Sequence, residues 1–254
     1  MKPTKTLLVS VIVLLFAAQL RAAQVTVFAA ASLTESLQEI AAAYEKQSGD
    51  KIVFNFAASG TLARQLAEGA PADIVFFADE ARADALEKNG LLVKETRQSR
   101  LGNSLVMVAL PDGPAVHSPA DLTNAFVRRV ALGEVKIVPA GTYAKVYFEK
   151  SGLWAAIEPK VVPCENVRAV LAAVESGNVD AGVVYKTDAA ISKKVKVVFE
   201  VPAADCPKIS YPVALVASAP QPEAAKHFLG YLAGNETGAV FARYGFIVLP
   251  AAGK

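Results

Sequence analysis

Two short segments of the chain repeat the same order of residue types around a serine. They read FAAASLTES and FAASGTLAR, and their serines, Ser32 and Ser59, lie 27 residues apart. Each serine follows an alternating apolar run, typical of a strand, and leads into a run with helical spacing. A serine at such a turn either caps the helix or donates its hydroxyl to a bound group. Ser32 and Glu35 also fit a capping box, which predicts Ser32 as an N-cap.

The paired strand-to-helix turns favour an anion site. Neighbouring parallel strands would place the two helix N-termini side by side, and the first amides of a helix have no partner within it. The helix dipole adds about half a positive charge at each N-terminus, and the serine hydroxyls add two donors. We therefore expect Ser32 and Ser59 to hold an anion, with simple capping as the alternative.

The second half of the chain offers three more candidate donors. Ala140 stands at a predicted strand-to-helix turn in VPAGTYAK, beside Gly141, which permits close approach of the backbone. Val167 follows the expected N-cap residue Asn166 at a helix start in CENVRAVL. Tyr185 ends the predicted strand in GVVYKTDA, and its hydroxyl can donate. Each position also has an ordinary interpretation, as a turn, a helix start or a half-buried tyrosine.

Catalytic arrangements are poorly represented. Of the two histidines, His117 lies in a proline-rich loop and His227 in a predicted helix, and we expect structural roles for both. The nucleophile elbow, the Walker A motif, HExxH and CxxC do not occur in the sequence. Asp79 is expected to cap the helix that follows it. We therefore predict that the chain is not an enzyme, and keep a secreted serine hydrolase using Ser32 or Ser59 as an alternative.

Two further pairs of residues remain outside the predicted site. Arg64 and Arg168 fall in early turns of predicted helices, and we expect them to form surface ion pairs rather than ligand contacts. Cys164 and Cys206 are equally consistent with a disulfide and with two free thiols, because the sequence gives no distance between them.

The first 22 residues differ from the rest of the chain. Lys2 and Lys5 precede an apolar run of 12 residues, and small residues follow before Ala23. This order predicts a cleavable signal peptide and export to the periplasm. A membrane anchor is the alternative, although the run is well short of the roughly 20 residues that span a bilayer. No cysteine lies at the expected cleavage site, which argues against a lipoprotein.

Cleavage changes the charge balance of the chain. It removes Lys2, Lys5 and Arg21 but no acidic residue, so 26 basic residues become 23 against 24 acidic ones, and the net charge changes from +2 to −1. No basic field then remains to attract nucleic acid, and we expect no nucleic-acid partner.

The order of predicted elements indicates an α/β protein with two lobes. Strands and helices alternate, and the pattern restarts after a stretch rich in Pro and Gly. We predict lobe 1 from residues 23–104 plus 214–254 and lobe 2 from residues 105–213. Each lobe should be a mixed, largely parallel sheet flanked by helices, and two crossover strands should form the hinge. Ligands bind beyond the carboxyl ends of strands in such sheets, so an interlobe cleft would gather the candidate donors.

Taken together, these motifs resemble those of the periplasmic molybdate-binding proteins, the solute receptors of molybdate ABC importers. The resemblance covers nearly all of the mature chain, in order, through VTVFAAASLTESL, SGTLARQLAEGAPADIVFFAD, LGNSLVMVA, VPAGTYAK, NVRAVLAAVESGNVDAGVVYKTDA and the final YGF. It implies a type II periplasmic-binding-protein fold with a hinged cleft, no cofactor, a monomer, and a membrane permease as partner.

The resemblance also implies the ligand contacts. In that family, two serines, two backbone amides and one tyrosine hold a tetrahedral oxyanion through its oxygens. Matched motif by motif, these groups are the hydroxyls of Ser32 and Ser59, the amides of Ala140 and Val167, and the hydroxyl of Tyr185. Gly60 stands where some relatives have serine, and the two cysteines lie outside the family pattern.

A site made only of donors predicts which oxyanions it accepts. Phosphate near pH 7 carries an O–H and needs an acceptor such as an aspartate, whereas molybdate, tungstate and sulfate are fully ionised. The resemblance selects molybdate, together with tungstate. A binding protein for sulfate stays open as an alternative, and so does an extracytoplasmic interaction module with a structural cleft.

Overall fold

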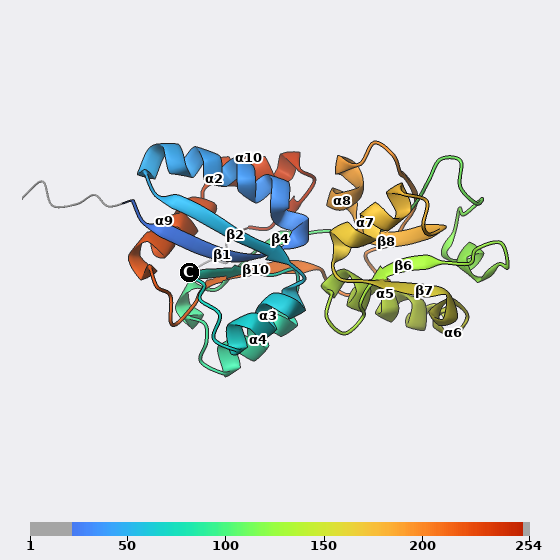
Figure 1. Cartoon of the computed structure of the whole chain (residues 1–254), viewed down its shortest axis with the longest axis horizontal. Coiled ribbons are helices and arrows are strands. Elements are labelled where there is room, and N and C mark those ends of the chain that lie inside the picture. Colours follow the sequence, from blue (N-terminus) through green and yellow to red (C-terminus); the bar gives the residue numbers. More distant parts are fainter. Residues whose placement is uncertain (1–21, 251–254) are drawn as a thin grey trace, which may run out of the picture.

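The computed structural model describes residues 22–250 of the 254-residue chain. The expected signal peptide, residues 1–22, lies outside the described residues apart from Ala22. Within residues 22–250, no helix combines the length and the apolar character needed to cross a membrane. The described chain forms two lobes, each built on one mixed sheet with helices on both faces (Figure 1). This architecture confirms the predicted two-lobed α/β fold with mixed sheets flanked by helices. The sheets are not largely parallel, because four strand pairs of the described chain are parallel and five are antiparallel.

The first lobe is a six-stranded sheet in the order β11-β4-β10-β3-β1-β2. Its strands are β1 (Gln24–Ala30), β2 (Lys51–Ala57), β3 (Ile74–Phe76), β4 (Gln98–Gly102), β10 (Ser210–Leu215) and β11 (Ile247–Val248). Its helices are α2 (Thr34–Ser48), α3 (Ser59–Ala67), α4 (Glu80–Lys88), α9 (Pro222–Leu232) and α10 (Asn235–Arg243). Helices α2, α9 and α10 cover one face of the sheet, and α3 and α4 cover the other (Figure 1).

Helix α2 shows how the sequence attaches a helix to this sheet. Its side chains Leu37, Ile40, Ala41 and Tyr44 follow the spacing of one helix face, and all four are buried. The helix ends at Gly49, whose φ of 79° is the left-handed conformation that suits glycine at a C-terminus. The packed face fixes where the N-terminus of α2 lies relative to β1.

The parallel strands of the first lobe end together at the edge that faces the second lobe. β1 pairs in parallel with β2, where Ala30 lies opposite Ala57, and with β3, where Ala29 lies opposite Phe76. A helical turn follows β1 directly and α3 begins two residues after β2. The helix starts are therefore brought side by side, as the repeated segments predict.

The second lobe is a five-stranded sheet in the order β7-β6-β8-β5-β9. Its strands are β5 (Leu105–Ala109), β6 (Val130–Gly133), β7 (Val161–Cys164), β8 (Ala181–Tyr185) and β9 (Lys196–Glu200). Its helices are α5 (Pro139–Lys150), α6 (Trp154–Ile157), α7 (Val167–Glu175) and α8 (Lys186–Ile191). β6 pairs in parallel with β7 and β8, and β5 runs antiparallel to β8 and β9.

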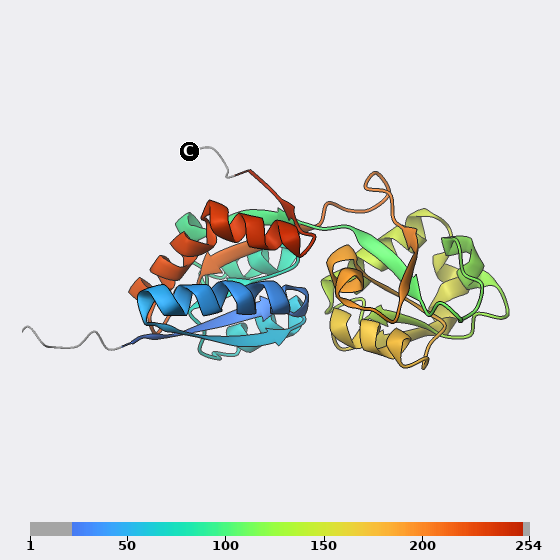
Figure 2. The same cartoon turned by 90° about the horizontal axis from the view of Figure 1, so that it is seen from above.

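The chain passes between the lobes twice (Figure 2). The first passage is residues 103–104, between β4 and β5, and the second is residues 201–209, between β9 and β10. β10 pairs with β3 and β4 in the first sheet, so the chain rejoins lobe 1 at Ser210, a few residues before the expected return at 214. A strand inside a sheet needs partners on both sides for its backbone groups. β5 and β10, the two strands expected to cross between the lobes, therefore each pair within a single sheet. The chain crosses between the lobes in the loops that precede them.

Candidate functional site

A small pocket lies between the lobes, and both lobes line it. Residues of the first lobe in the lining are Ala30, Ala31, Ser32, Ala57, Ala58, Ser59 and Ala78, and residues of the second are Val138, Pro139, Ala140, Asn166, Val167 and Tyr185. All five predicted ligand residues are in this set. The pocket is small, because the centre of a water-sized sphere can move within a volume of only about 10 Å³. A ligand of more than a few heavy atoms therefore does not fit while the lobes are in contact.

Ser32 lies in a 3-10 turn, Ala31–Leu33, and makes no capping hydrogen bond to α2. The predicted capping box is therefore wrong. The Glu35 carboxylate instead pairs with Arg168 of the second lobe, at 3.0 Å and 2.5 Å through its two oxygens. A bidentate guanidinium is a stronger partner for a carboxylate than one backbone amide. The Ser32 side chain, which is buried, is thereby left for the pocket.

Ser59 is the first residue of α3 and is fully buried. Ala58 is the N-cap residue, so the Ser59 hydroxyl does not cap the helix. Its Oγ accepts a hydrogen bond from the backbone N–H of Ala78 at 2.9 Å. Because the oxygen is already an acceptor in this bond, the hydroxyl hydrogen remains available to a ligand.

Ala140 presents a free backbone amide at the start of α5. It is the second residue of the helix, after Pro139, and amides of the first turn have no partner within a helix. A Cβ on Gly141 would lie 1.9 Å from the carbonyl oxygen of Gly133 at the end of β6. Glycine therefore lets the first turn of α5 pack directly on the strand end, which places the Ala140 amide at the pocket.

Val167 presents a second amide, at the first position of α7. Asn166 is the N-cap, as expected, and its Oδ1 accepts hydrogen bonds from the amides of Arg168 and Ala169 at 2.9 Å and 3.0 Å. The cap therefore uses the second and third amides of the helix and leaves the first. Asn166 also lines the pocket, a position that sequence reasoning assigned only to the cap.

Tyr185 ends β8 and is almost completely buried. Its hydroxyl has no hydrogen-bond partner among the described residues. Burial raises the pKa of this hydroxyl well above its ordinary value, so it keeps its hydrogen. Buried polar groups almost always have partners. The Tyr185 hydroxyl is therefore a donor in the lining of a small pocket that a bound acceptor could satisfy.

The pocket has positive electrostatic character without a charged side chain. Neither a lysine, an arginine, a histidine nor a carboxylate is in its described lining. The starts of α3, α5 and α7 and the turn before α2 all meet there and bring the positive ends of helix dipoles together, and α5 and α7 add amides that have no partner within the helix. This arrangement suits a small anion without an O–H. It also lacks the histidine–acid pair that a serine nucleophile requires.

Arg168 forms an ion-paired bridge between the lobes just outside the lining. Its Nε lies 2.8 Å from Asp188 Oδ1, but the two atoms are not aligned for a hydrogen bond. Its Nη2 also lies 3.4 Å from the carbonyl oxygen of Ser32. Burial raises the pKa of Asp188 to about 6, even with the opposing effect of Arg168. The positive charge of Arg168 is therefore balanced by the carboxylates of Asp188 and Glu35 and is not available to a ligand.

Hydrogen bonds to backbone carbonyl oxygens also hold the lobes together. The N–H of Gly60 donates to the carbonyl oxygen of Ile137 at 3.1 Å. A Cβ on Gly60 would lie 2.4 Å from that same oxygen, so only glycine fits this contact. Arg82 Nη2 donates to the carbonyl oxygen of Lys136 at 2.6 Å, and Tyr143 Oη to that of Ala78 at 3.3 Å. The structure is therefore a closed form.

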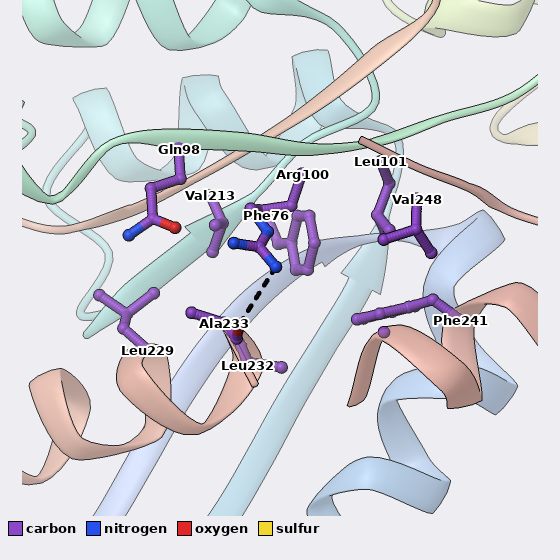
Figure 3. Close-up of a pocket in the computed structure, with 11 residues that line it drawn as sticks. Phe76, Gln98, Arg100, Leu101, Val213, Leu229, Leu232, Ala233, Phe241 and Val248 are labelled. Carbon is purple, nitrogen blue, oxygen red and sulfur yellow. Dashed lines mark hydrogen bonds between the residues drawn. The ribbon is translucent and has the colours of Figure 1, made fainter. Parts of the chain in front are cut away.

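A second pocket lies within the first lobe, between β4 and helices α9 and α10 (Figure 3). Apolar side chains dominate it, among them Leu229, Leu232 and Phe241. Arg100 donates from Nη2 to the carbonyl oxygen of Ala233, the C-cap of α9, at 3.1 Å. A cation at the C-terminus of a helix is a common stabilising contact. This pocket is therefore explained by packing and capping.

The remaining predictions from single residues have clear outcomes. Asp79 caps α4, since its Oδ1 accepts from the amide of Arg82 at 2.9 Å. Arg64 lies 4.0 Å from Glu68 in an exposed pair, as expected. The prediction for Arg168 is right about the ion pair but wrong about the surface, because the pair joins the lobes.

Cys164 and Cys206 are free thiols, which resolves the alternative left open by the sequence. Among residues 22–250, no cluster of His, Cys, Asp or Glu could hold a metal ion.

Sequence reasoning missed two polar residues that support the pocket. Tyr211 Oη lies 3.1 Å from Ser32 Oγ, and Asn103 Nδ2 donates to Tyr211 Oη at 3.1 Å. Both side chains are buried. Tyr211 comes just after the second passage between the lobes and Asn103 within the first. Polar residues next to predicted crossovers are the signal that could have indicated them.

Comparisons with known proteins identify the family of the chain. A family model described as bacterial extracellular solute-binding protein matches residues 25–247. The molybdate-binding protein ModA of Escherichia coli K12 is 41% identical over 230 residues, which cover 89% of each chain. The putative ABC transporter substrate-binding lipoprotein YvgL of Bacillus subtilis 168 is 40% identical, covering 87% of this chain and 85% of that protein.

Solved structures show the same fold. The periplasmic molybdate-binding protein of Azotobacter vinelandii superimposes with a TM-score of 0.77 at 23% identity, covering 89% of this chain and 99% of that one. The substrate-binding domain of a putative molybdenum ABC transporter from Clostridium difficile gives a TM-score of 0.69 at 33% identity, covering 90% and 100%. By the extent of the family match and the identity to these relatives, the chain belongs to the bacterial extracellular solute-binding proteins.

Proposed function

We propose that the protein captures molybdate, and also tungstate, in the interlobe pocket and delivers it to the membrane permease of an ABC importer. The observation that carries the proposal is a small interlobe pocket whose available polar groups are donors without a full charge. The names of relatives at 41% and 38% identity, both molybdate-binding proteins, support the choice of anion. The proposed site of action is the periplasm, the proposed working state is a monomer, and no cofactor takes part.

The proposed ligand contacts are five hydrogen bonds to the oxygens of the anion. The donors are the hydroxyls of Ser32, Ser59 and Tyr185 and the amides of Ala140 and Val167. A hydrogen bond to a charged group contributes about 1.5–3 kcal/mol, so a few neutral donors can hold a dianion. They also leave binding readily reversible, which a protein that delivers its ligand requires.

Lobe closure completes the site in this mechanism. Ser32 and Ser59 belong to the first lobe, while Ala140, Val167 and Tyr185 belong to the second, so an open form divides the donors into two half-sites. Closure excludes water and strengthens each contact. A permease that recognises the closed form would then accept the loaded protein, because the ligand shifts the population toward closure.

The alternatives make different demands on the pocket. A sulfate-binding protein would use the same donors and differ only in preferred size. A serine hydrolase would need a histidine–acid pair beside Ser32 or Ser59, and the described lining contains none. An interaction module with a structural cleft would leave the buried Tyr185 hydroxyl without a partner. Anion titrations separate these possibilities.

An anion series tests the proposed selectivity. Molybdate and tungstate should each raise the melting temperature of the mature protein, by an amount equivalent to about 2.7 kcal/mol at a hundredfold excess over Kd. Phosphate should not, because its O–H meets only donors. Differential scanning fluorimetry with molybdate, tungstate, sulfate and phosphate makes the comparison. Equal shifts with phosphate would contradict the donor-only site, and a shift with sulfate alone would contradict the choice of molybdate.

A matched pair of substitutions at Val167 tests the backbone contact. Val167→Pro removes the amide at the first helical position, where proline is well tolerated. Asn166 is already extended, with φ −158° and ψ 175°, as a residue before proline prefers. We expect Val167→Pro to lose roughly 1.5–3 kcal/mol of molybdate binding. Val167→Ala removes part of the same apolar side chain, keeps the amide and should bind nearly as the wild type does.

Isothermal titration calorimetry measures both affinities, and circular dichroism checks that both variants fold. Normal binding by a folded Val167→Pro variant would show that this amide is not a ligand. Equal losses in the two variants would instead assign the effect to the side chain.

Glu35→Gln tests whether the Arg168 bridge holds the closed form. Arg168 keeps its contact with Asp188, so no buried charge is left alone. Because Glu35 pairs across the lobes only when they touch, molybdate should dissociate about 3- to 10-fold faster, equivalent to roughly 1 kcal/mol. The association rate and the unliganded melting temperature should hardly change. Stopped-flow kinetics measures both rates.

Glu39→Gln is the control for this experiment. Glu39 lies one turn further along α2 and pairs with Arg243 within the first lobe. Glu39→Gln should leave the dissociation rate of molybdate unchanged. If Glu35→Gln and Glu39→Gln release molybdate at the same rate, the Arg168 bridge makes no contribution to closure.

A further inference from the structure

A chain of buried hydrogen bonds leads from the interlobe passages to Ser32. Asn103 lies in the first passage, Tyr211 follows the second, and Ser32 lines the pocket. Asn103 Nδ2 donates to Tyr211 Oη at 3.1 Å, and Tyr211 Oη lies 3.1 Å from Ser32 Oγ. The last contact alone permits either oxygen to donate. The direction of this hydrogen bond decides whether the Ser32 hydroxyl donates a hydrogen bond to the ligand or accepts one from it.

The orientation of the Asn103 amide is fixed by its other contacts. Its Oδ1 accepts from the backbone N–H of Ser104 at 2.9 Å. Its Nδ2 also donates to Thr187 Oγ1 at 2.9 Å. Reversing the amide would place its NH₂ against the Ser104 N–H and remove both donations. The group that faces Tyr211 is therefore a donor.

Tyr211 must then direct its own hydrogen to Ser32. Its side chain is fully buried, and burial raises the pKa of its hydroxyl far above the ordinary value, so the hydrogen is retained. Its hydrogen-bond contacts within residues 22–250 are Asn103 Nδ2 and Ser32 Oγ. The amide nitrogen cannot accept, so Ser32 Oγ is the acceptor. A buried hydroxyl without an acceptor would be costly.

We propose that Asn103 and Tyr211 are specificity-determining positioning residues, which occupy the Ser32 oxygen as an acceptor and so make Ser32 a donor toward the ligand. Ser59 is placed in the same state by the amide of Ala78. In each serine the network occupies one acceptor site of the oxygen, which leaves the hydroxyl hydrogen without a network partner and free to point at the ligand. The pair thereby selects fully ionised anions over hydrogenphosphate. This inference rests on the proposed function and adds the residues that set the selectivity.

Tyr211→Phe removes the donor to Ser32 and keeps the ring. Ser32 can then turn its hydrogen away and accept from a protonated ligand. Sulfate and phosphate are the probes, because they are similar in size and differ near pH 7 in the O–H. Competition calorimetry gives, for sulfate and for phosphate, the concentration that displaces half of the bound molybdate. The sulfate-to-phosphate preference should fall about tenfold, and molybdate itself should bind about 3- to 10-fold more weakly.

Asn103→Asp is the second variant, and it preserves the size of the side chain. Its carboxylate accepts the Tyr211 hydrogen and so draws that hydrogen away from Ser32. It should shift the sulfate-to-phosphate preference in the same direction. It also keeps the proposal testable if Tyr211→Phe does not fold. Tyr244→Phe is the control, because the Tyr244 hydroxyl donates to Glu39 on an exposed surface at 2.9 Å, and it should change neither value.

The wild-type protein separates this inference from the proposed function. If the wild type binds no oxyanion, both are wrong. If it binds molybdate and the folded variants weaken sulfate and phosphate equally, the proposed function stands and the inference is overturned. A lower sulfate-to-phosphate preference in both variants, with an unchanged preference in Tyr244→Phe, supports the inference, and a higher preference in either variant overturns it.

Discussion

The site depends on backbone amides at helix starts that the helices themselves cannot use. In α7 the Asn166 cap takes the amides of Arg168 and Ala169 and leaves that of Val167. In α5 the amide of Ala140 is likewise left over. Such groups need a partner when buried. Because the strands of both sheets direct these helix starts to one interlobe pocket, the proposed anion would satisfy groups from both lobes at once.

The site also keeps charge away from its ligand. Arg168 lies between Glu35 and Asp188 and forms a bridge between the lobes, and it is not among the residues of the pocket lining. In the proposed function the cation therefore acts on closure, while neutral donors act on the anion. The bridge also connects the two half-sites, since Arg168 follows Val167 in sequence and contacts the carbonyl oxygen of Ser32. The proposed mechanism therefore couples closure to ligand contact through neighbouring residues.

Much of this arrangement was predictable because it is local. The strand–Ala–Ser–helix repeats place Ser32 and Ser59, and the cap at Asn166 follows from residue type and position. The capping box of Ser32 failed because the partner of Glu35, Arg168, is distant in sequence. Long-range contacts explain the other differences as well. The strand before the predicted turn at Ala140 ends earlier, since β6 spans Val130–Gly133 and lies beside β7 and β8, and β10 joins the first sheet earlier than expected. No local pattern indicates that Tyr211 reaches a serine 179 residues away.

The most direct measurement is a crystal structure of the molybdate complex, with the metal located by its anomalous scattering. The account predicts one molybdenum atom in the interlobe pocket, with its oxygens about 2.7–3.2 Å from five donors. These donors are the hydroxyls of Ser32, Ser59 and Tyr185 and the amides of Ala140 and Val167. The Arg168 guanidinium should remain between its two carboxylates. A molybdenum atom bound elsewhere, or oxygens held by Arg168 or another charged side chain, would contradict the account.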